Sequence, residues 1–346
     1  MYALVLMSAG VGAADNARVN EGRTLNAASK VVMPGPATGA KELQRIVVAI
    51  KPWERGLPLA AAHARQLAKS VGAEIRLVST VFDTSVGVGR ERGDAKAMVR
   101  SERVAEAARV ELERLAQSMR EWGANVTTKI VWDASAHAGI LSAVRDWHAD
   151  LVVVGVHERR PLHTRLTDTD WQLMRHVPCP LLLVKDPVFE GYQTIVAAVD
   201  PLHVHAEPSG LDRAVLAAGR AFARAFGSTL RVVNAYPGAA AFELASAVQV
   251  APGVFYGAEN VSALHERAVT ELVEQYGVSR SEIDLVEGRP AEAIVDTAAA
   301  RRAQLVVVGA PQRRGRLAAV VGSTAEVVAA EAPCDVLLVP PPADQR

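Results

Sequence analysis

The sequence lacks several features that mark large classes of proteins. It has two cysteines in 346 residues, Cys179 and Cys334, which are too few for a disulfide framework and favour a reducing compartment, the cytoplasm. Basic and acidic residues are balanced at 38 each, so the charge favours neither nucleic acid nor a membrane surface as a partner. No apolar run approaches the roughly 18 residues of a membrane span. The composition therefore predicts a globular protein without a nucleic-acid or membrane partner.

Motifs of common catalytic sites are missing as well. The sequence contains no Walker-type Gly-Lys-Thr, no Gly-x-Ser-x-Gly elbow and no Cys–His–Asp order. His203 and His205 lie near Glu207, but a structural metal site usually needs four ligands, so a surface loop is the better interpretation. We therefore expect no catalytic residue and no metal site.

The first 43 residues differ in pattern from the rest. Residues 1–14 are mildly apolar, but no lysine or arginine precedes them, which disfavours a signal peptide. Residues 22–39 contain Ser, Pro, Gly and Asn without a period. The sequence predicts a flexible tail over residues 1–43.

From residue 44 onward the chain contains a repeat. Three segments that read as buried strands recur in the same order, 149, 154 and 155 residues later, which indicates a tandem duplication. We predict one domain over residues 44–186 and a second over residues 192–341, with the linker around residues 185–193. The paired segments are residues 46–52 and 195–201, residues 150–155 and 304–309, and residues 177–184 and 332–339.

Each half alternates strands with helices. In the first half, apolar and β-branched runs predict strands, and segments with apolar residues at three- and four-residue steps predict helices between them. Such alternation is typical of a parallel, doubly wound sheet, so the fold class is α/β with two tandem five-stranded, Rossmann-like sheets. The expected strands are residues 46–50, 74–81, 126–131, 151–154 and 181–184, and the expected helices include residues 58–71, 136–147 and 168–176.

Residues 304–340 contain the most informative local pattern. A β-branched strand over residues 305–308 ends at Gly309, and Gly322-Ser323-Thr324 opens a helix over residues 325–332. The free N–H groups and partial positive charge of a helix start can bind an anion, and a glycine lets a phosphate approach. The alternative is a plain cap, in which Ser323 and Glu326 form a capping box. The local residues leave both interpretations open.

These features resemble the universal stress protein family, and the two fused halves resemble its tandem-domain members. The family's phosphate motif is Gly, two residues, Gly, nine residues, then Gly-Ser or Gly-Thr; here Gln312 takes the place of the second glycine. The resemblance implies that ATP, with or without Mg²⁺, binds in the second half. Carried over by position, Asp200 is expected near the adenine or ribose and Ala235 at the adenine. The expected phosphate contacts are Gly309, Gln312, Gly322, Ser323 and Thr324.

The first half departs further from that motif. Lys51 replaces the aspartate at the end of the first strand, and Glu158 replaces the second glycine. By the motif's spacing, Asp168-Thr169 replaces Gly-Ser. A carboxylate at a helix start suits the helix dipole and caps the helix well, so we expect Asp168 to be the cap of this helix. It would also repel phosphate, so we interpret Asp168 as a built-in substitute for the anion. The first half is therefore expected not to bind ATP in the family manner.

The function expected from the resemblance is a cytoplasmic stress-response regulator that acts through nucleotide binding, with at most very slow hydrolysis of ATP. The alternative is a scaffold or small-ligand carrier of the same fold, which Gln312 and the altered first half favour. A synthetase-like adenylyl transferase is disfavoured, because Asp200-Pro201-Leu202 lacks a pyrophosphate loop. Its protein partner is not evident from the sequence. Residues 181–186 and 336–341 are expected to pair antiparallel within one chain as a pseudo-dimer, which could also form a homodimer.

Overall fold

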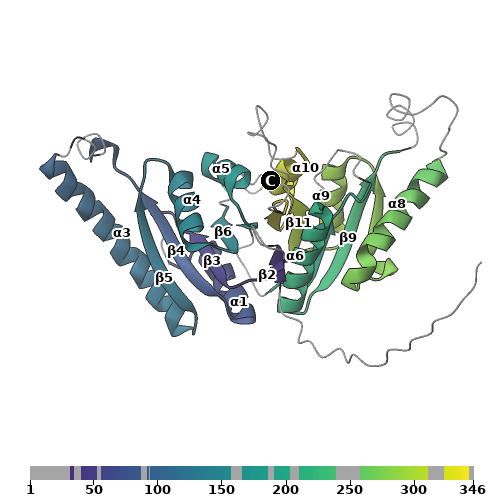
Figure 1. Cartoon of the computed structure of the whole chain (residues 1–346), viewed down its shortest axis with the longest axis horizontal. Helices are drawn as coiled ribbons and strands as arrows, with labels where there is room; N and C mark the ends of the chain where they lie inside the picture. The colour runs from purple at the N-terminus through teal and green to yellow at the C-terminus, as the bar shows by residue number, and fades with distance from the viewer. Residues whose placement is uncertain are drawn as a thin grey trace, which may run out of the picture. The chain divides into compact units, whose positions relative to one another are not determined.

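The structure of the protein is a computed structural model (Figure 1). The described residues are 32–34, 40–52, 56–86, 92, 94–156, 166–185, 191–202, 210–238, 258–310 and 323–342.

The first half begins with strand β3 and ends with strand β7. Its elements are β3 (Arg45–Ala49), α1 (Leu59–Val71), β4 (Glu74–Val81), α3 (Ala95–Glu121), β5 (Asn125–Trp132), α4 (Ala136–Trp147), β6 (Leu151–Gly155), α5 (Asp168–His176) and β7 (Leu181–Val184).

The second half repeats this order of elements. They are β8 (Thr194–Ala198), α6 (Leu211–Phe226), β9 (Thr229–Tyr236), α8 (Ala258–Val273), β10 (Ile283–Glu287), α9 (Pro290–Ala300), β11 (Leu305–Gly309), α10 (Ser323–Glu331) and β12 (Asp335–Val339). Two short 3₁₀ turns, Glu274–Tyr276 and Arg280–Glu282, connect α8 to β10.

The two halves join into one sheet of ten strands, in the order β10-β9-β8-β11-β12-β7-β6-β3-β4-β5. Within each half all neighbouring strands are parallel, which confirms the α/β fold class. The halves meet where β12 pairs antiparallel with β7, Leu337 lying opposite Leu182. The expected antiparallel pairing of the two apolar edges is therefore confirmed, and each edge is covered by the other.

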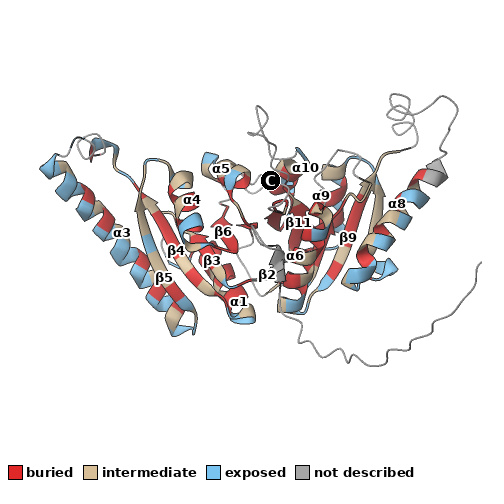
Figure 2. Cartoon of the chain, viewed as in Figure 1, coloured by how far each residue is buried: buried red, intermediate tan, exposed pale blue. Residues whose placement is uncertain are grey.

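Helices cover both faces of this sheet (Figure 1). One apolar core packs α1, α3, α6 and α8 against one face, and it includes the fully buried Phe222. The other core packs α4, α5, α9 and α10 against the opposite face, and it includes Leu173 and Val328. Figure 2 shows buried residues along the strands and the inner sides of the helices, while the outer side of α3 is exposed. Burial on both faces explains why the strands are continuous apolar runs.

A buried carboxylate fastens the two halves at their junction. Asp335 is fully buried and accepts hydrogen bonds from the backbone N–H of Lys185 at 2.8 Å and the hydroxyl of Tyr192 at 2.8 Å. His63 of α1 places its Nε2 3.2 Å from the same carboxylate. The Nζ of Lys185 donates to the carbonyl of Ala332 at 2.9 Å. Because buried charges must be satisfied locally, these contacts fix how β7 and β12 meet.

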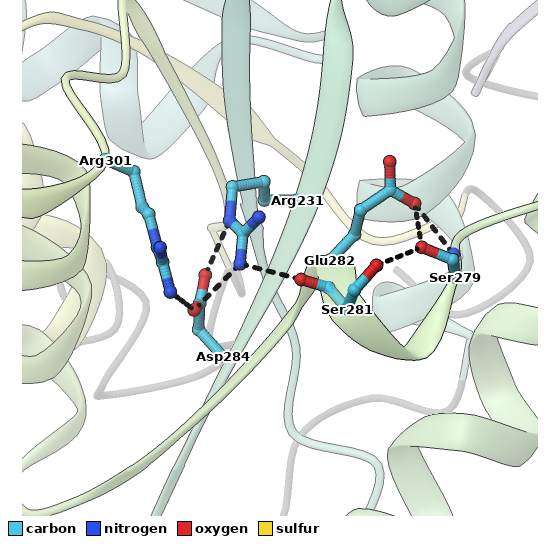
Figure 3. Close-up of polar contacts among 6 residues, drawn as sticks. All are labelled: Arg231, Ser279, Ser281, Glu282, Asp284 and Arg301. Atoms are coloured by element: carbon cyan, nitrogen blue, oxygen red, sulfur yellow. Dashed lines mark hydrogen bonds and ion pairs between the residues drawn. The ribbon is translucent and has the colours of Figure 1, made fainter.

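A second network joins β9, β10 and α9 (Figure 3). The Asp284 carboxylate lies between two guanidinium groups: Arg231 donates at 2.9 and 3.0 Å, and Arg301 donates at 2.5 Å. Burial opposes ionisation of Asp284, but these hydrogen bonds outweigh it and lower its pKa. Ser279 and Glu282 form a capping box beside them. The network anchors the edge strand β10 to the rest of the second half.

The predicted tail needs one correction. Val32–Pro34 (β1) and Ala40–Glu42 (β2) pair as a small antiparallel sheet, and β1 lies against α6. Val32 is β-branched and suits a strand, and Gly35, Pro36 and Gly39 are turn formers between the two segments. This part of the segment over residues 1–43 therefore has secondary structure.

Candidate functional site

A cavity of about 400 Å³ opens at the carboxyl ends of β8, β9 and β11. Strand β8 has β9 on one side and β11 on the other, and the chain leaves these strands toward helices on opposite faces. Such a reversal of strand order creates a crevice at the carboxyl ends of an open α/β sheet, where ligands bind. The lining is mainly apolar, with contributions from Val199, Leu211, Val233, Ile294 and Val308.

Four of the seven residues predicted from the motif line this cavity. They are Asp200 after β8, Ala235 on β9, Gly309 at the end of β11 and Thr324 in the first turn of α10. The structure brings these residues together although Asp200 and Thr324 are 124 positions apart in the sequence. Their placement follows from the strand ends, because parallel strands deliver their carboxyl ends to one edge.

The other three predicted residues have different outcomes. Ser323 is exposed and is not among the lining residues. It is the first residue of α10, so the helix starts two residues earlier than expected and Ser323 does not occupy the capping position. Gln312 and Gly322 lie outside the described residues, as do His203, His205, Glu207 and Glu158.

Glu326, the proposed partner of Ser323 in a capping box, makes a different contact. Its Oε1 lies 3.7 Å from Nη2 of Arg175 on α5, so it forms an ion pair between the two halves. Of the two interpretations of this helix start, the capping box at Ser323 is therefore not observed.

Gly309 allows two elements to approach closely. A Cβ atom placed on Gly309 would lie 2.7 Å from Cδ2 and 2.8 Å from Cγ of Leu211. Leu211 is the first residue of α6 and is 2% exposed. The absence of a side chain at position 309 therefore lets α6 begin directly against the end of β11 and gives the cavity its shape.

The polar part of the lining centres on two aspartates. The backbone N–H of Asp200 donates to Oδ1 of Asp212 at 3.0 Å, which fixes the turn that follows β8. The Oδ1 of Asp200 is buried and has no hydrogen-bond partner among the described residues. An acceptor of this kind suits a ligand hydroxyl or amino group, because a buried acceptor without a donor is costly.

Behind this turn lies a buried pair of side chains. Asn234 donates from Nδ2 to the carbonyl of Val199 at 2.9 Å, so its Oδ1 accepts from Nδ1 of His265 at 2.8 Å. Both side chains are almost fully buried. Burial lowers the pKa of His265, and the nearby charge of Asp200 opposes that effect. The pair supports the end of β8, which carries Asp200.

The corresponding crevice of the first half is arranged differently. Lys51, which stands where Asp200 does, donates from Nζ to the carbonyl of Gly155 at 3.3 Å. Its chain and its charge therefore lie over the strand end that corresponds to Gly309. This arrangement is consistent with the expected loss of the family's nucleotide site in the first half.

The assignment of Asp168 as the cap of α5 is wrong. The cap is Thr167, whose hydroxyl accepts from the N–H of Asp170 at 3.3 Å, while the Asp170 carboxylate accepts from the N–H and the hydroxyl of Thr167. Asp168 is exposed in the first turn. The helix starts 13 residues after Gly155, but 14 residues after Gly309, so the motif spacing points one residue too far.

The sequence did not indicate several residues of the crevice. Leu211 and Asp212 follow a long connection after β8, and Arg289 precedes α9. Arg289 could have been found by the rule that loops after parallel strands line the crevice. Asn234 and His265 belong to no sequence motif that would mark them as part of the site. Among the described residues, no group of three or more His, Cys, Asp and Glu side chains could hold a metal ion. Cys179 and Cys334 are both buried.

Known proteins match most of the chain. The model of the universal stress protein family matches residues 42–185 and again residues 191–340. Universal stress protein E of Escherichia coli K12 is 27% identical over 310 residues, which cover 86% of this chain and 94% of that protein. Universal stress protein E of Photorhabdus laumondii is 25% identical over 301 residues, 86% of this chain and 95% of that protein.

Solved structures match as well. The crystal structure of a universal stress protein from Pseudomonas aeruginosa superposes with a TM-score of 0.65 at 25% identity, covering 87% of this chain and 94% of that one. A universal stress protein solved in complex with cAMP matches 43% of this chain at 26% identity, with a TM-score of 0.31.

Within the described residues, none of the helices has the length and apolar character needed to cross a membrane.

Proposed function

Because this chain is a tandem member that belongs to the universal stress protein family, we propose that its second half binds ATP or a related adenine nucleotide in the crevice at the ends of β8, β9 and β11. The observation that carries the proposal is that Asp200, Ala235, Gly309 and Thr324, selected by position in the family's pattern, line one cavity. The first half is proposed not to bind nucleotide in this manner.

The crevice has the chemistry that an adenine nucleotide requires. Its apolar walls, among them Val199 and Ile294, suit a flat base, and the buried Oδ1 of Asp200 suits a donor on the base or ribose. The phosphates would lie toward Gly309 and the first turn of α10, where helical N–H groups favour negative charge. Mg²⁺ would accompany the phosphates and is not needed for the contacts of the base.

We propose that the protein acts through occupancy of this site rather than through turnover. Helix α10 leads directly into β12, the strand that joins the two halves. A nucleotide that contacts the start of α10 is therefore well placed to alter the surface that a protein partner would read. Hydrolysis is expected to be very slow at most, since the chain lacks a Walker-type Gly-Lys-Thr.

Isothermal titration calorimetry of the full chain with ATP tests the proposal. Ala235→Phe would fill the part of the cavity next to β9, so we expect ATP binding to be lost. Ala107→Phe, the same substitution on the exposed side of α3, is the control and should bind ATP as the wild type does. Titrations with and without Mg²⁺ would measure its contribution.

The outcomes separate the proposal from its alternative. If the folded wild type binds neither ATP nor AMP, the nucleotide site is refuted, and a scaffold or small-ligand carrier becomes the better description. Equal affinities of the wild type and Ala235→Phe would place any bound nucleotide outside this crevice.

A further inference from the structure

The first half contains a cavity of its own, of about 800 Å³, between α3 and the ends of β3 and β4. Its volume lies within the range of roughly 300–1,000 Å³ that is usual for small-molecule sites. It is larger than the crevice of the second half, which is about 400 Å³. We propose that this cavity is a second binding site, which takes a small organic molecule with an apolar body and an anionic head.

The cavity is not the first-half copy of the nucleotide crevice. Ser79 lines it and lies on the same side of β4 as Leu77, which packs in the core that contains α3. The crevice of the second half instead uses Val233 and Ala235, which lie on the other side of β9. The two sites share equivalent positions at the end of the first strand, since Ile50 and Lys51 correspond to Val199 and Asp200, but the rest of their linings lies on opposite faces of the sheet.

A comparison of the two halves shows why the space is open. The strand registers make Ser79 the counterpart of Asn234 and Ile50 the counterpart of Val199. In the second half, Asn234 spans from the carbonyl of Val199 to His265 on α8. In the first half the shorter Ser79 makes no such bridge, and the corresponding space beside α3 remains a cavity.

Ser79 also supplies a group that needs a ligand. Its side chain is almost fully buried, with 3% of the residue exposed, and its Oγ has no hydrogen-bond partner among the described residues. A buried hydroxyl without a partner is destabilising, and a bound hydrogen-bonding group would satisfy it. Apolar side chains form part of the wall, among them Ile50, Leu112 and Leu115, and polar side chains form the rest.

The charges of the lining favour an anion. Lys51, whose Nζ donates to the carbonyl of Gly155, and Arg114 are basic and Glu111 is acidic, which leaves one net positive charge in the lining. Glu111 binds Arg114 at 2.7 and 2.8 Å one turn along α3, and both side chains are more than 60% exposed. This pair can open toward a ligand at small cost, because exposed ion pairs contribute little. An anionic head at the mouth and an apolar body within would match the lining.

The anionic dye 8-anilinonaphthalene-1-sulfonate has this chemistry and serves as the probe. We expect its fluorescence to rise with the folded full-length protein. Ala108→Phe projects into the cavity and should weaken binding about tenfold or more, whereas Ala107→Phe, one residue along the same helix and exposed, should not. Ser118→Phe, with Gln117→Phe as its control, repeats the test at an exposed position of the rim.

The charge requirement has a matched control on the same helix. Arg114→Gln should weaken dye binding by about two- to fivefold, while Arg109→Gln, which removes the partner of Glu106 outside the cavity, should leave it unchanged. Thermal unfolding of each variant checks that it is folded.

Three results would overturn the proposal. The first is no binding of the dye to the wild type. The second is that both filling variants, Ala108→Phe and Ser118→Phe, bind the dye as tightly as the wild type does. The third is displacement of the dye by ATP, which would place it in the crevice of the second half. The test does not depend on nucleotide binding, since the proposed site can bind the dye whether or not ATP binds elsewhere.

Discussion

The glycines that end β6 and β11 offer a matched pair of substitutions. A methyl group added at Gly309 would lie 2.7 Å from Cδ2 of Leu211, whereas ordinary contacts begin at 3.4 Å, so one side must move by about 0.7 Å. At Gly155, the counterpart in the first half, the added methyl group would have its nearest neighbour, the N of Ala60, at 3.7 Å. Gly309→Ala is therefore expected to disturb packing, and Gly155→Ala is not.

The size of the effect follows from the surroundings of Leu211. This side chain is 2% exposed and belongs to the first residue of α6, so it has little room to retreat. Overpacking in such a position costs about 1–3 kcal/mol of unfolding free energy. Leu211 also lines the crevice, and its movement would narrow the cavity. A loss of about 1.4 kcal/mol in binding corresponds to a tenfold weaker affinity, which is the effect we expect for ATP.

Urea unfolding and ATP calorimetry on both variants measure these quantities. Gly155→Ala should stay within about 0.5 kcal/mol of the wild type or gain slightly, because alanine reduces the entropy of the unfolded chain. If Gly309→Ala is as stable as Gly155→Ala, the packing argument is refuted. If it is destabilised but binds ATP normally, Leu211 does not shape the nucleotide site.

Three further changes test other parts of the structure. Asp335→Ala should lower the unfolding free energy by about 3 kcal/mol in urea titrations, because Lys185 and Tyr192 lose a buried acceptor; an effect below about 1 kcal/mol would contradict this role. Burial lowers the pKa of His265, so its stabilising contribution is present above the ordinary pKa of 6.5 and is lost as the pH falls below it. Stability should therefore fall more steeply from pH 7 to 5 in the wild type than in His265→Gln, and equal slopes would contradict the assignment. Thr167→Ala removes the cap of α5 and should cost about 1 kcal/mol in thermal unfolding, whereas Asp168→Ala should cost less; the reverse order would restore Asp168 as the cap.

The fold was predictable where the apolar residues of a segment follow a regular pattern. The expected bounds of β4, β7, α4 and α5 coincide with the observed ones. The two strands are mainly apolar runs and the two helices are amphipathic, and turn-forming residues lie at their ends. The antiparallel junction was predictable because two apolar edges cannot remain exposed. The pair of strands β1 and β2 was not predictable, since segments of three residues carry no periodic signal.

The candidate site was predictable only in part. Asp200, Ala235 and Gly309 lie at strand ends, which the order of strands brings together. Asp212 and Leu211 reach the crevice from a helix whose start follows residues that have no pattern. Asn234 and His265 are 31 residues apart and meet only because α8 packs over β9. Long-range contacts of this kind depend on helix placement, which sequence spacing does not encode.

The antiparallel seam between β7 and β12 has a consequence for how the molecule responds to dilution. Two separate subunits that met through these edges would come apart at low concentration, whereas covalent linkage keeps the second edge at a high effective concentration. The partnership between the more altered half and the half that kept most of the motif is thus independent of expression level. Every molecule carries one copy of each cavity, and the ratio between them cannot drift.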